Sequence, residues 1–119
     1  MTKSFTVFFP IKTYREIMAK DQKEALEKGF DKLMAWLDLK NITLDWNIVN
    51  AAIVVGDEGI TFFWKKREVS PEEFCRQFPR ESFHEIFAKK IIKELFYRNP
   101  STKCWKDFWE YTSTYIKWF

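Results

Sequence analysis

The sequence predicts an α+β fold: a small, mostly antiparallel sheet of three or four strands, covered on one face by helices, three of them C-terminal. Two observations support this prediction. Residues 42–49 alternate between apolar and polar with the period of a half-buried strand, and residues 51–55 and 60–66 have β character on either side of a glycine-flanked turn. After residue 70, helix-capping sequences precede apolar stripes of helical period. Strands followed by a run of helices are typical of α+β domains.

Length and composition indicate one globular domain spanning residues 1–119. The apolar fraction of 46% is ordinary, but the aromatic fraction of 19% is high and implies a core built from large rings. The net charge of +3 is uneven, with −1 in residues 1–59 and +4 in residues 60–119. A basic second half is a weak indication of an anionic partner, and an ordinary lysine-rich soluble surface explains it equally well.

The sequence contains no segment that predicts export or membrane insertion. The start lacks the apolar stretch of a signal peptide, and the longest apolar run, Ala51–Val55, is far too short to span a bilayer. Cys75 and Cys104 are isolated rather than paired in CxxC motifs. We therefore expect reduced thiols, a cytoplasmic protein and no contact with a membrane.

The N-terminal third predicts a strand and then helix. Residues 4–11 are β-branched and aromatic, and Pro10 either ends this strand or places it at a sheet edge. Thr13 and Glu16 have capping-box spacing, which predicts a short helical turn in which Tyr14, Ile17 and Met18 share a face.

A second cap, Asp21-x-x-Glu24, predicts a longer helix from about Gln22 to Asp38. Gly29 falls on the buried side of that helix, where a glycine costs about 1 kcal/mol relative to alanine. We expect it to permit close packing against a strand.

The middle of the chain predicts a β-hairpin. Residues 42–49 alternate in a strand pattern, and residues 51–55 continue the β character in a phase that the pattern leaves open. Residues 56–59 form a glycine-flanked turn, and residues 60–66 form the returning strand. Its side chains are expected to divide between two faces, with Ile60, Phe62 and Trp64 on one and Thr61, Phe63 and Lys65 on the other.

The last part of the chain predicts three helices. Ser70-Pro-Glu-Glu73 combines a cap, a proline at the first helical position and a capping box, and Pro79 ends this short helix. A second helix starts at Ser82. The third spans residues 101–119, and half of its circumference is aromatic or apolar.

No pattern in the sequence predicts catalysis, a cofactor or a metal. His84 is the only histidine and lies on an apolar stripe, where a packed side chain is the ordinary interpretation. Most carboxylates lie in caps and turns, and glycine-rich phosphate loops and GxSxG motifs are absent. We therefore expect a protein that is not an enzyme.

The remaining features favour a small non-enzymatic binding protein that acts on another protein by occlusion, as an inhibitor or adaptor. Tryptophan and tyrosine are common interface anchors because they bury a large area and keep a polar group. The edge of the final helix carries the residues least easily covered by the chain itself, and these are the predicted partner-binding residues: Tyr111, Trp118 and Phe119.

Two alternatives remain open. Residues 61–67 place aromatic side chains beside three consecutive basic residues, the combination that stacks bases and neutralises phosphates. A nucleic-acid-binding protein would use Phe63, Trp64, Lys65, Lys66 and Arg67. The second alternative is a structural subunit that homodimerises through its final helix.

Deletion of Trp118 and Phe119 tests the predicted C-terminal interface. If these residues contact a partner or a second copy, the shortened chain keeps its thermal stability and loses that association, because edge residues bury little within the chain itself. Sedimentation and thermal unfolding measure the two properties. A large fall in the melting temperature would show instead that the C-terminal residues belong to the core.

Overall fold

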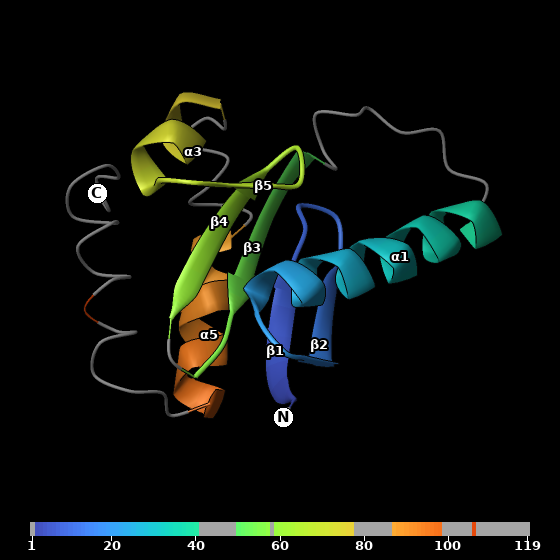
Figure 1. Cartoon of the computed structure of the whole chain (residues 1–119), viewed down its shortest axis with the longest axis horizontal. Coiled ribbons are helices and arrows are strands. Elements are labelled where there is room, and N and C mark those ends of the chain that lie inside the picture. Colours follow the sequence, from blue (N-terminus) through green and yellow to red (C-terminus); the bar gives the residue numbers. More distant parts are fainter. Residues whose placement is uncertain (1, 41–49, 58, 78–86, 99–105, 107–119) are drawn as a thin grey trace.

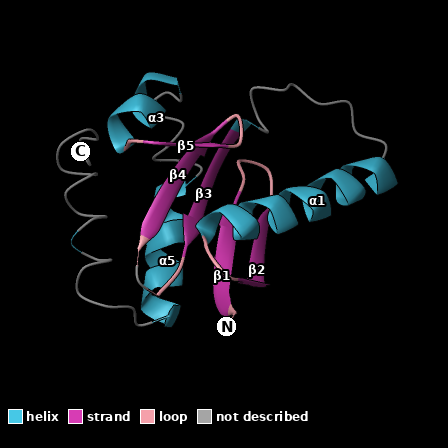
Figure 2. Cartoon of the chain, in the orientation of Figure 1, coloured by secondary structure: helices cyan, strands magenta, loops and turns pink. Residues whose placement is uncertain are grey.

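The fold is a five-stranded antiparallel sheet with helices on both faces (Figures 1 and 2). The computed structural model describes residues 2–40, 50–57, 59–77, 87–98 and 106. The strand order is β2-β1-β3-β4-β5. The elements, in chain order, are β1 (Lys3–Phe8), β2 (Thr13–Ala19), α1 (Gln22–Lys40), β3 (Ala51–Val55), β4 (Ile60–Trp64), β5 (Arg67–Val69), α3 (Pro71–Gln77) and α5 (Lys89–Arg98).

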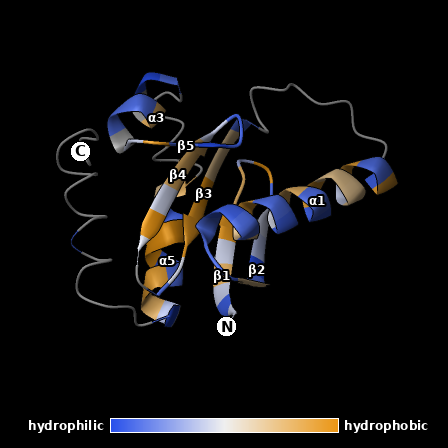
Figure 3. Cartoon of the chain, in the orientation of Figure 1, coloured by the Kyte–Doolittle hydropathy of each residue, from blue (hydrophilic) through white to orange (hydrophobic). Residues whose placement is uncertain are grey.

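The α+β class is confirmed, but the expectation that helices cover one face is wrong. All five residues of β3 are buried, so both of its faces need a cover. Ala52 and Val54 face the core beneath α1, whereas Ala51, Ile53 and Val55 face the core beneath α3 and α5. Figure 1 shows α1 crossing one face of the sheet and α5 lying behind it, and Figure 3 shows apolar residues on β3 and α5.

The predicted helical turn after Thr13 is also wrong, because these residues form the edge strand β2. Val7 pairs with Tyr14 and Phe5 pairs with Ile17, so two residues of β2, Arg15 and Glu16, lie opposite a single residue of β1. This is a β-bulge, and Glu16 adopts a φ of 57° within it. The extra residue puts Tyr14 and Ile17 on the same face although they are three positions apart.

Helix α1 forms as predicted. The backbone N–H of Glu24 donates to Asp21 Oδ1 at 2.9 Å, which is the bond expected of a capping residue. Leu26, Leu33 and Leu37 lie on its buried face. Gly29 faces β1 so closely that an added Cβ would lie 3.0 Å from Val7 Cβ and Cγ1. The expected close approach between Gly29 and a strand is confirmed.

The hairpin at residues 56–59 is confirmed, but the returning strand ends two residues earlier than predicted. Val55 pairs with Ile60, and β4 stops at Trp64. Lys65 and Lys66 have φ values of 53° and 65°, and they form a two-residue turn into β5, which the sequence did not predict. The Lys66 ammonium lies 3.9 Å from the centroid of the Phe30 ring, which ties this turn to α1.

Helices α3 and α5 cover the second face of the sheet. The Ser70 cap is confirmed by a 3.1 Å bond from the Glu73 N–H to Ser70 Oγ. The core between these helices and the sheet contains Phe74, Phe87, Ile91 and Leu95. The predicted strand 42–49, the helix start at Ser82 with His84, and the final helix 101–119 with its interface residues lie outside the described residues, except Lys106.

Lysines of α1 reach backbone carbonyls near both outer strands. Lys28 Nζ donates to the Met18 carbonyl of β2 at 2.6 Å, and Lys23 Nζ donates to the Lys66 carbonyl in the turn before β5. One helix therefore supplies hydrogen-bond donors near the two edges of the sheet.

Replacement of Gly29 by alanine tests the contact between α1 and β1. Alanine raises helix propensity by about 1 kcal/mol. We nevertheless expect a net fall in the free energy of unfolding, because overpacking costs about 1–3 kcal/mol and Val7 is fully buried. Urea denaturation of Gly29→Ala, Val7→Ala and the double variant measures the coupling. In the Val7→Ala background Gly29→Ala should cost less than in the wild type, because the Cγ1 and Cγ2 contacts are gone although the Cβ contact remains. Additive effects would contradict the steric explanation.

Candidate binding site between β2 and α5

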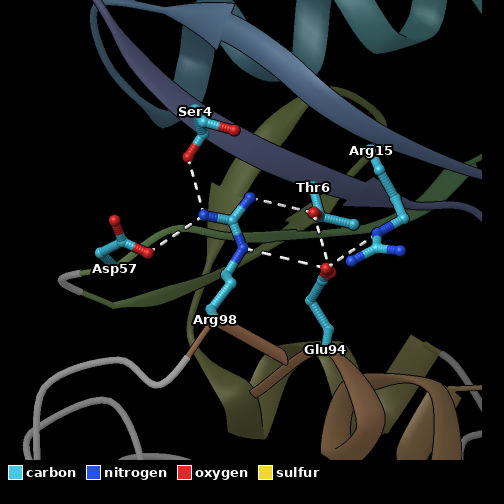
Figure 4. Close-up of polar contacts among 6 residues, drawn as sticks. All are labelled: Ser4, Thr6, Arg15, Asp57, Glu94 and Arg98. Carbon is cyan, nitrogen blue, oxygen red and sulfur yellow. Dashed lines mark hydrogen bonds and ion pairs between the residues drawn. The ribbon is translucent and has the colours of Figure 1, made fainter. Parts of the chain in front are cut away.

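The most unusual feature of the second face is a buried carboxylate on α5. Glu94 is only 5% exposed, although glutamate is rarely buried without a partner. Its Oε2 accepts a hydrogen bond from Thr6 Oγ1 at 3.1 Å, and its Oε1 accepts from Arg15 Nε at 3.1 Å (Figure 4). Both carboxylate oxygens are therefore engaged, one by β1 and one by β2.

Arg98 balances the negative charge from the next turn of α5. Its side chain is 8% exposed, and Nη1 donates to the Ser4 carbonyl at 2.9 Å and to Asp57 Oδ1 at 3.1 Å. Nη2 donates to Thr6 Oγ1 at 3.0 Å. Arg98 Nε stands 4.0 Å from Glu94 Oε1, a distance for an ion pair but not for a hydrogen bond. The Arg98 guanidinium therefore links the end of α5 to β1 and to the β3–β4 turn (Figure 4).

The bulge in β2 brings Arg15 to this cluster. Thr6 points toward α5, and the two bulge residues lie opposite it, so Arg15 leaves the strand on the side of α5. Its guanidinium carbon also lies 4.0 Å from the centroid of the Tyr97 ring, which is within range of a cation–π contact. Arg15 remains half-exposed, whereas the carboxylate that holds it is buried.

Beside Arg15 is an open pocket of ≈ 390 Å³, a volume within the range of ligand sites. Three of its lining residues are cationic and one, Glu94, is anionic, so the lining carries a positive excess. Lys90 and Lys93 are exposed, and the buried Thr13 Oγ1 has no hydrogen-bond partner within the described part of the chain. The pocket is lined by Phe8, Thr13, Arg15, Lys90, Lys93, Glu94 and Tyr97.

The residues of the predicted nucleic-acid strand, 63–67, do not share one exposed surface. Phe63 is fully buried beneath α1, so it offers no exposed face on which a base could stack, and the use of this strand by a nucleic acid stays a prediction. Trp64 packs against the opposite core. Lys65, Lys66 and Arg67 are exposed, as a contact with phosphates would require. The predicted interface residues Tyr111, Trp118 and Phe119 lie outside the described residues and stay a prediction.

Sequence reasoning missed the cluster around Glu94, although one signal for it was present. Ile91, Leu95 and Arg98 fall on one side of a helix with Glu94, so a carboxylate interrupts an apolar stripe four positions before an arginine. That spacing is typical of an ion pair on a helix, and its place within an apolar stripe favours burial. The partnership with Arg15 has no local signal, because 79 positions separate the two residues.

Within the described ranges, no three histidine, cysteine, aspartate or glutamate side chains gather as metal ligands would. No helix among the described residues is long and apolar enough to cross a membrane. Comparison of the chain with protein families, with curated proteins and with solved structures gives no match.

Replacement of Glu94 by alanine tests how far the cluster supports the fold. We expect a loss of about 1–3 kcal/mol in the free energy of unfolding, because Thr6 Oγ1 loses its buried acceptor and Arg98, still paired with Asp57, loses a second carboxylate. Arg15→Ala should cost about 1 kcal/mol or less, since this side chain is half-exposed and screened by water.

Urea denaturation measures both losses, and Glu72→Ala is the matched control. Glu72 also pairs with an arginine four residues later, but both partners are exposed, so its removal should change stability little. Equal small losses for Glu94 and Glu72 would contradict a structural role for the cluster.

Proposed function

We propose that this chain is a non-enzymatic binding protein that occludes part of a partner protein through the face formed by β2 and α5. The observation that supports this proposal best is the pocket beside Arg15, where exposed cations and an aromatic ring surround an apolar base. Its isolated cysteines are compatible with action in the reducing cytoplasm.

The chemistry of this face resembles that of protein interfaces. Arginine and tyrosine are enriched among the residues that dominate binding energy. Tyr97 is 70% exposed and presents a large ring next to Arg15. Contact with a partner would bury that ring and the half-exposed guanidinium together, which is the usual way such residues contribute to affinity.

The anchoring of Arg15 also favours binding. A mobile arginine loses rotamer freedom when it is fixed at an interface, and this loss weakens association. Arg15 is already held by Glu94 on one side and by Tyr97 on the other. Both oxygens of Glu94 accept hydrogen bonds, which leaves this carboxylate poorly suited to act as a general base.

A photo-crosslinking amino acid at position 93 tests the proposed face. Lys93 is exposed on the wall of the pocket, so a protein bound there should form an adduct of defined mass in an extract of the producing cell. Position 32 is the matched control, since Lys32 is an exposed lysine on α1, across the sheet. Mass spectrometry identifies the adduct and distinguishes another protein from a second copy.

We expect an adduct from position 93, a much weaker one from position 32, and loss of the first when Tyr97 is replaced by alanine. Equal adducts from both positions would contradict a specific face. An adduct that contains nucleic acid in place of protein would reject the proposed function.

A further inference from the structure

The geometry points to a more specific role for the pocket: it recognises a carboxylate group on an acidic segment of the partner, and Arg15 is the residue that binds it. This inference rests on the proposed function and names the partner's chemistry. It starts from the way in which Arg15 is held.

Only part of the Arg15 guanidinium is used within the described structure. Its Nε donates to Glu94 Oε1, and its plane lies over the Tyr97 ring. The two terminal nitrogens, Nη1 and Nη2, make no hydrogen bond to a described residue, and Figure 4 shows no contact drawn to them. Two parallel donors in a fixed plane match the two oxygens of a carboxylate.

The other groups of the pocket suit the same ligand. Lys90 and Lys93 add positive charge on the α5 side, and neither forms an ion pair with a described residue. Thr13 also lines the pocket, and its Oγ1 has no hydrogen-bond partner among the described residues. The single carboxylate in the lining, Glu94, is occupied by Thr6 and Arg15.

The distribution of charge favours an acidic protein segment over a nucleic acid. A nucleic-acid strand needs cations along its whole backbone. The exposed run Lys65–Arg67 lies at the β5 edge of the sheet, opposite the β2 edge that carries Arg15, and Glu68 follows it directly. The described basic groups therefore do not form one track. Phe8 and the exposed Tyr97 ring instead suit apolar side chains beside the acidic one.

Titration with a hexaglutamate peptide tests the inference. NMR signals of the Arg15 Nε–H and of the backbone amides of residues 13–15 and 90–97 report where the peptide binds. We expect saturable shifts at these positions with hexaglutamate, and none with hexalysine. Inorganic phosphate and a single-stranded DNA dodecamer are the competing anions, and both should bind more weakly than the peptide.

Variants separate a shaped site from general charge attraction. Arg15→Gln and Lys65→Gln each remove one positive charge, but at opposite edges of the sheet. Arg15→Gln should weaken hexaglutamate binding by about tenfold or more, the usual effect of losing a charged hydrogen bond, while Lys65→Gln leaves it unchanged. Arg15→Lys keeps the charge and loses the fork, so it should also bind weakly. Circular dichroism checks that each variant is folded.

Equal losses from Arg15→Gln and Lys65→Gln, full binding by Arg15→Lys, or tighter binding of DNA or phosphate would each overturn the inference. Its failure can be told apart from failure of the proposed function. If the adduct from position 93 forms and Arg15→Gln does not weaken it, the face binds a protein without a carboxylate site. If hexaglutamate binds as expected but position 93 yields no protein adduct, the carboxylate site stands and occlusion of a partner fails.

Discussion

The interaction on which the second face depends is the one between the Glu94 carboxylate and the three groups around it. Apolar packing has little directional preference, so the stripe of α5 alone would tolerate small rotations and shifts over the sheet. Hydrogen bonds to Thr6 and Arg15 depend on distance and angle, so they favour one position of the helix. Arg98 then fixes its last turn against β1. The contact with Glu94 also fixes Arg15, one of the two residues of the β2 bulge.

This cluster is better explained by positioning than by stability. Taking charges out of water has a cost that a buried ion pair often fails to recover, and well-packed apolar residues can be as stable. Arg98 Nε has no hydrogen-bond partner among the residues that the structure describes, which adds to that cost. An apolar replacement of Glu94 would, however, leave Arg15 without its anchor. The buried carboxylate therefore makes most sense as the support of a surface group.

Elements whose pattern is local could be predicted from the sequence, and those that depend on a distant partner could not. Helix α1 and the β3–β4 hairpin have caps, turns and periodicities within themselves, and both were predicted. Strand β2 was mistaken for helix because its bulge puts Tyr14 and Ile17 on one face, which imitates the spacing of a helical turn. Strand β5 was missed because Lys65 and Lys66 form a tight turn without glycine.

The site follows the same rule. The basic run at residues 65–67 can be recognised from the sequence alone, because it consists of three consecutive residues. Phe63 has the same strand pattern whether its face is open or covered, and only the position of α1 shows that it is covered. The pocket combines β2 with a helix more than seventy residues later, and the sequence shows no link between them.

The two lysines that α1 directs at the sheet edges make it harder for another extended chain to pair with the outer strands. An outer strand with free carbonyls is a template on which another extended chain can grow, and repetition of that step produces fibrils. Here Lys28 occupies a carbonyl of β2, Lys23 occupies the carbonyl before β5, and the bulge twists β2 out of line. Growth through the sheet edges is thereby discouraged.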